Sequence, residues 1–103
     1  MEVILLTVQD CPNAAAFEER LAAALAGHAG AVVRYRELAD EQEAAHAGMH
    51  GSPTLLINGV DPFAQPGQAP SVSCRLYRDA AGQIADAPSV QSLRQALAAA
   101  GHD

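Results

Sequence analysis

The chain of 103 residues has no tryptophan and only two Tyr and two Phe. Because large rings supply much of the volume of most cores, this core must depend on Leu, Val and Ile. Positive charge is also scarce, since six Lys and Arg stand against twelve Asp and Glu and the net charge is −6. Nucleic acids and anionic membranes both require a basic protein face, so the composition argues against both partners.

Long hydrophobic runs are missing as well. No apolar stretch approaches the roughly 20 residues that span a bilayer. The first residues, Met1 to Leu6, carry neither a basic region nor a small-residue cleavage site, so no secretory signal is expected. The prediction is a cytoplasmic protein with a single domain over residues 1–103.

Patterns of apolar and turn-forming residues predict seven elements in the order β-α-β-α-β-β-α. Phe17, Leu21 and Leu25 recur at helical spacing and mark one face of the first helix, and the same kind of stripe follows Ser89. The predicted elements are a buried strand over 2–8, a helix from Pro12 to Gly27 or Gly30, a partly exposed strand over 31–38, a helix over 41–47 capped by Asp40, strands over 54–57 and 72–77, and a helix capped by Ser89 that ends at Gly101.

These elements predict an α/β fold. Strand, helix and strand within the first 38 residues form a βαβ unit, whose two strands are parallel. Asn58-Gly59 is a strong turn signal directly after the strand 54–57. We expect a four-stranded mixed sheet flanked by three helices, with the strands 2–8 and 54–57 in its centre. The strand 31–38 would then be an uncovered edge.

Cys11 is the first candidate for chemistry. It directly precedes Pro12, and a helix that begins there would place the thiol at the N-cap, where free N–H groups and the helix dipole favour a thiolate. The neighbouring carboxylate of Asp10 opposes a second negative charge. Cys11 is therefore either a nucleophile or an inert capping residue.

Cys74 allows two interpretations. It shares a strand face with Val72 and Leu76, which is typical of a small buried hydrophobe. The alternative is a resolving thiol that the fold brings near Cys11, so that the two could cycle as a disulfide. Sequence alone does not fix the distance between them.

The loop after the third predicted strand, Asp61 to Gly67, carries Phe63 in a polar, proline-rich setting. Phe63 either lies over the Cys11 pocket as a contact for a substrate or partner, or pins the loop to the body of the protein. His46 and His50 stand four residues apart, a spacing that can hold a metal, but the helix is ending there and we interpret both as surface residues. No cofactor and no resident metal are predicted.

The order of the elements, a cysteine at the first helix and Gly51-Ser52-Pro53-Thr54 before the third strand together resemble thioredoxin. The chain is more closely similar to small bacterial thioredoxin-like proteins, some of which are called alkylmercury lyases. The segments that carry this similarity are Cys11-Pro12-Asn13, Gly51-Ser52-Pro53-Thr54, Asp61-Pro62-Phe63-Ala64 and Ser73-Cys74-Arg75-Leu76-Tyr77-Arg78.

The resemblance implies that Pro53 is cis and lies beside Cys11. It also implies that Pro53 and the Thr54 backbone position a thiol or disulfide partner, with Pro12 and Ser52 as neighbouring contacts. The chain departs from thioredoxin at one decisive place, because the Cys-x-x-Cys motif ends here in Ala14. Dithiol cycling within one motif is therefore excluded.

Three functions stay open at this point. The first is thiol–disulfide chemistry through Cys11, with Cys74 as the candidate resolver and a protein or small-molecule disulfide as partner. The second is binding of a soft metal or an organomercurial by both thiols. Cleavage of a carbon–mercury bond would also need a proton donor, for which Asp10 and Asp61 are the candidates. The third is a non-catalytic module that binds another protein through the edge at Pro53.

Overall fold

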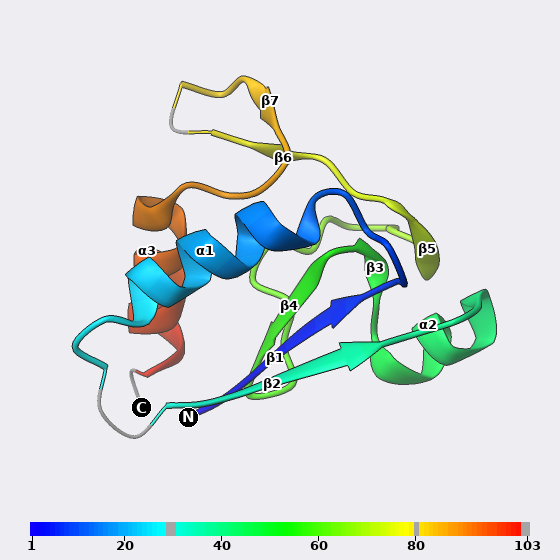
Figure 1. Cartoon of the computed structure of the whole chain (residues 1–103), viewed down its shortest axis with the longest axis horizontal. Helices are drawn as coiled ribbons and strands as arrows, with labels where there is room; N and C mark the ends of the chain where they lie inside the picture. Colours follow the sequence, from blue (N-terminus) through cyan, green and yellow to red (C-terminus); the bar gives the residue numbers. More distant parts are fainter. Residues whose placement is uncertain (29–30, 80, 102–103) are drawn as a thin grey trace.

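A computed structural model describes residues 1–28, 31–79 and 81–101 of the chain. Figure 1 shows three helices around a short sheet, with a small hairpin that projects beyond them. The elements are β1 (Glu2–Thr7), α1 (Ala14–Leu25), β2 (Val32–Glu37), α2 (Glu41–Ala47), β3 (His50–Ser52), β4 (Thr54–Ile57), β5 (Ser71–Cys74), β6 (Tyr77–Arg78), β7 (Ile84–Ala85) and α3 (Val90–Ala100).

The main sheet has three described strands in the order β2-β1-β4. Strand β1 lies in the centre, parallel to β2 with Val3 opposite Val33, and antiparallel to β4 with Val3 opposite Ile57. The predicted α/β class, the mixed sheet and the three helices are thus confirmed. Strand β4 was expected in the centre of a four-stranded sheet, but among the described strands it pairs only with β1.

The segment expected as one strand over 72–77 explains this difference. It divides into β5, which pairs in parallel with β3, and β6, which pairs with β7 in a separate hairpin. The amide of Arg75 donates to the carbonyl of Ser52 at 3.0 Å, which ties the segment to β3 instead of β4. The segment expected as the fourth strand therefore pairs with β3, the strand directly before β4, and this pair lies outside the main sheet.

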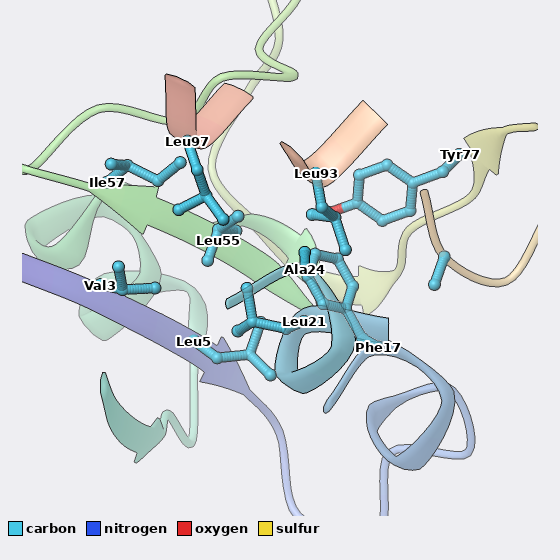
Figure 2. Close-up of a cluster of buried hydrophobic side chains, with 11 residues drawn as sticks. Val3, Leu5, Phe17, Leu21, Ala24, Leu55, Ile57, Tyr77, Leu93 and Leu97 are labelled. Carbon is cyan, nitrogen blue, oxygen red and sulfur yellow. The ribbon is translucent and has the colours of Figure 1, made fainter. Parts of the chain in front are cut away.

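Two apolar clusters cover the two faces of the main sheet. On one face, α1 and α3 pack on β1 and β4; Figure 2 shows Leu21 of α1 next to Leu5, Leu97 of α3 next to Leu55, and Leu93 of α3 next to the Tyr77 ring. On the other face, the short α2 contributes Ala44 to a cluster that contains Leu6, Leu38, Met49 and Leu56. The core depends on aliphatic side chains, as the composition predicts.

Local signals for caps and turns are borne out in three places. The carboxylate of Asp40 accepts a hydrogen bond from the amide of Glu43 at the start of α2, and Ser89 caps α3 through the amide of Ser92. Asn58 and Gly59 both have positive φ, 51° and 82°, as a tight two-residue turn requires. Helix α1 ends near Gly27, whose φ is 86°, whereas Gly30 lies outside the described residues.

None of the described helices has the length and apolar character that crossing a membrane requires.

Candidate functional site

Cys11 lies in the turn between β1 and α1 and is half-buried. Its amide donates to the carbonyl of Val8 at 3.3 Å, and its carbonyl accepts from the amide of Ala14 at the same distance. Helix α1 begins at Ala14 with Asn13 at the N-cap, so the expected helix start at Pro12 is wrong. The thiol therefore precedes the N-cap by two residues, and the N–H groups of the first helical turn are further from it than expected.

The Ser52–Pro53 peptide bond is cis. Ser52, Pro53 and Thr54 are all buried below 2% exposure, so their side chains are out of reach of a partner in this conformation. The hydroxyl of Ser52 accepts a hydrogen bond from the amide of Val8 at 3.1 Å, and its carbonyl accepts from Arg75. Ser52 thus joins the end of β1 to the end of β5.

Cys74 lies at the end of β5, where its Cα is the partner of Ser52 in the β3–β5 pairing. The prediction of a buried Cys74 beside Leu76 is wrong, because Cys74 is exposed and Leu76 is 58% exposed. Instead Arg75 and Tyr77 point inward, each 6% exposed. The segment is turned over relative to the expectation, with its polar face buried and its cysteine at the surface.

A series of contacts that passes through Ser52 connects the two free cysteines. Cys11 is hydrogen-bonded to Val8, Val8 is hydrogen-bonded to Ser52, and Ser52 is paired with Cys74. In the view of Figure 1, the loop after β1 and strand β5 appear at the same end of the molecule. The fold thus brings Cys11 and Cys74 to the same end of the molecule, although they are 63 positions apart in the sequence.

Arg75 is the residue that sequence reasoning missed. Its guanidinium forms a buried ion pair with Asp61 at 2.7 Å, both side chains being about 5% exposed or less. It also donates to the carbonyl of Phe63 at 2.8 Å and to the hydroxyl of Thr54 at 3.3 Å, and it lies 4.8 Å from the ring centre of Tyr77. These contacts satisfy the charge well enough for the guanidinium to be buried.

Tyr77 connects this cluster to the cis-proline turn, because its hydroxyl donates to the carbonyl of Pro53. Burial raises the pKa of the phenol far above its ordinary value; the charge of Arg75 opposes this shift, and the negative charges of Asp61 and Cys11 add to it.

The position of Phe63 decides between the two interpretations of its loop. Its ring packs edge-on against Tyr77 with the centroids 5.6 Å apart, and it lies against the main core cluster. Its amide donates to the carboxylate of Asp61 at 2.9 Å. The interpretation that Phe63 pins the loop to the body is confirmed, and Asp61, held by Arg75, is not placed as a free proton donor for Cys11.

The described residues contain no group of three or more His, Cys, Asp or Glu that could hold a metal ion. His46 is exposed at the surface, as expected. The His50 ring lies 3.5 Å from the carbonyl of Ala69, at the limit of a hydrogen bond. A site for a soft ion would have to be built from the two thiols alone, and it stays a prediction.

Comparisons of this chain with protein-family models, with curated proteins and with solved structures find no significant match.

Proposed function

We propose that the protein is a thioredoxin-like thiol–disulfide oxidoreductase in which Cys11 is the nucleophile and Cys74 the resolving thiol. The observation that carries the proposal is a series of contacts between the two free cysteines: Cys74 pairs with Ser52 beside the cis-proline turn, Ser52 accepts a hydrogen bond from Val8, and Val8 accepts one from Cys11. The arrangement of β1, α1 and β2, with an antiparallel β4 after that turn, supports the thioredoxin-like part.

The reaction proceeds by two thiol–disulfide exchanges. The thiolate of Cys11 attacks one sulfur of the partner's disulfide; a mixed disulfide forms, and the other sulfur leaves as a thiolate that takes up a proton. The thiolate of Cys74 then attacks Sγ of Cys11, which releases the second partner thiol and leaves a Cys11–Cys74 disulfide. The partner gains two electrons, the protein loses two, and an external dithiol restores the protein.

Access to the thiols decides which residues meet the partner. Pro12 and Cys74 are exposed and Cys11 is half-buried, so these three form the accessible part of the site. Ser52 and Thr54 are buried beneath these residues. The Ser52 hydroxyl accepts a hydrogen bond from Val8 at the end of β1, and the Thr54 hydroxyl donates to the carbonyl of Gly51. We infer that they position the cysteines and have no direct contact with the partner.

The test is the reduction of a glutathione-blocked fluorescent peptide by the protein, with dithiothreitol as reductant. Replacing Cys11 by Ser should lower the rate to that of dithiothreitol alone, because the nucleophile is gone. Cys74→Ser should retain the first exchange and accumulate the mixed disulfide on Cys11, since only the external dithiol can resolve it.

Ser73→Ala is the matched control, because Ser73 is exposed beside Cys74 and carries no thiol. It should leave the rate unchanged. A wild-type rate for Cys11→Ser would show that Cys11 is not the nucleophile and would overturn the proposal.

A further inference from the structure

A trough crosses the molecule next to the loop that carries Phe63. Its first hollow, of about 640 Å³, lies between α3 and the loop after β4, and its second, of about 520 Å³, lies between the 63–68 loop and the β6–β7 hairpin. Phe63 and Ser92 line both hollows, so the two adjoin at these residues, and we call the pair the trough. Figure 1 shows the β6–β7 hairpin projecting beyond the helices.

Large apolar side chains stand exposed along the rims of the trough. Val60 is 64% exposed at the first hollow, and Leu76 and Ile84 are 58% and 64% exposed at the second. On the opposite wall, Ala96, with two further alanines of α3, presents short side chains that allow another chain to approach closely. Apolar groups of this kind gathered along one groove mark an interaction surface.

The floor of the trough is held in place before anything binds. Phe63 packs on Tyr77, and its carbonyl accepts a hydrogen bond from Arg75, whose own charge is matched by Asp61. A preorganised aromatic anchor costs little ordering on binding, which is a property of residues that dominate the energy of an interface.

The charge along the trough selects the partner. The described residues that line the two hollows include Arg75 and Arg78 but no Asp or Glu, in a chain whose net charge is −6. Arg75 is neutralised by Asp61, whereas Arg78 is exposed and no described carboxylate lies within ion-pair distance of it. A ligand is therefore favoured if it brings apolar groups to the rims and a carboxylate to Arg78.

We propose that this trough is a docking surface for a segment of another protein that combines apolar and acidic side chains. A protein segment fits better than a small molecule, because the exposed Val60 lines the first hollow and the exposed Leu76 and Ile84 line the second, and a chain lying across both hollows would cover all three. The proposal is independent of the thiol chemistry, since neither Cys11 nor Cys74 lines the trough.

The test is selection from a display library of random linear peptides on the full chain, under reducing conditions that prevent covalent capture by the cysteines. We expect enriched sequences in which Leu, Ile, Val or Phe alternate with Asp or Glu. The affinity of a synthetic peptide of the enriched sequence is then measured by fluorescence anisotropy. Arg78→Glu and Ile84→Ser should each weaken it by about tenfold or more.

Matched controls are available on the opposite edge of the molecule. Arg36→Glu repeats the charge reversal at an exposed arginine of β2, and Val32→Ser repeats the loss of an exposed apolar side chain. Both should leave the peptide affinity unchanged, and circular dichroism checks that all four variants are folded. The absence of enrichment, enrichment of peptides without acidic residues, or equal effects of trough and control variants would each overturn the proposal.

Discussion

Asp61→Ala is expected to lower the free energy of unfolding by about 3–5 kcal/mol, because it leaves the buried guanidinium of Arg75 without its counter-charge. The replacement also removes the acceptor of the Phe63 amide, so the loop loses a second contact. A domain of this size is typically stable by about 5–15 kcal/mol, and the variant should therefore be close to unfolding. Urea denaturation followed by far-ultraviolet circular dichroism measures the change.

Asp79→Ala is the matched control for this experiment. The Asp79 carboxylate also accepts backbone hydrogen bonds within its own loop, from the amides of Ala81 and Gln83, but it forms no described ion pair. Its loss should cost about 1 kcal/mol, the ordinary contribution of such bonds. Equal costs for Asp61→Ala and Asp79→Ala would show that the buried ion pair adds nothing to stability.

Gly51→Ala should destabilise the fold by about 2–5 kcal/mol, through two effects that add. The φ of Gly51 is 121°, a conformation that residues with a Cβ rarely adopt. A Cβ at this position would lie 2.7 Å from Cβ of Arg75 and 3.1 Å from the carbonyl oxygen of Ser73. Ser73 belongs to β5 and Arg75 directly follows it, so relief of these contacts requires the segment 73–75 to move away from β3.

Gly67→Ala separates these two effects. Gly67 also has a positive φ, 76°, but a Cβ there would meet nothing within 4 Å. We expect Gly67→Ala to lower the free energy of unfolding by only the conformational cost, about 1 kcal/mol. Thermal or urea unfolding of the two variants side by side gives the difference; if Gly51→Ala is no worse than Gly67→Ala, the close approach of β5 to Gly51 is not required for the fold.

Elements governed by local physics could be predicted from the sequence. The cap at Asp40, the cap at Ser89 and the Asn58-Gly59 turn all satisfy backbone groups through residues a few positions away. The buried stripes of α1 and α3 follow from helical spacing, and Phe17 and Leu93 lie in the core as that spacing requires. These interactions need no knowledge of the rest of the chain.

The strand pairing after β4 could not be predicted, because it depends on contacts between distant segments. Strand periodicity predicts two alternating faces for residues 72–77, and one of the two interpretations of Cys74 places the more apolar face, with Val72 and Leu76, in the core. The opposite face is buried because Asp61 satisfies Arg75 and the Pro53 carbonyl satisfies Tyr77. The available signal for a buried polar face was Arg75 two residues before Tyr77, together with Asp61 in the preceding loop.

The candidate site was found in its parts and only partly in its geometry. The sequence predicts Cys11, Cys74 and Pro53 as site residues; the structure pairs Cys74 with Ser52, and Ser52 is hydrogen-bonded to Val8, three residues before Cys11. The predicted start of α1 was wrong by two residues, because Pro12 and Asn13 lie in a turn and the helix begins at Ala14. A position at a helix end is decided by backbone angles that proline permits but does not dictate.

The central claim, that Cys11 and Cys74 form one redox couple, is tested most directly by oxidation of the reduced wild-type protein with glutathione disulfide. Intact mass and peptide mapping then show where the disulfides lie. We expect the loss of two hydrogen atoms, a peptide that links Cys11 to Cys74, and no bound glutathione. Glutathione on each cysteine separately, with no link between the two, would contradict the claim.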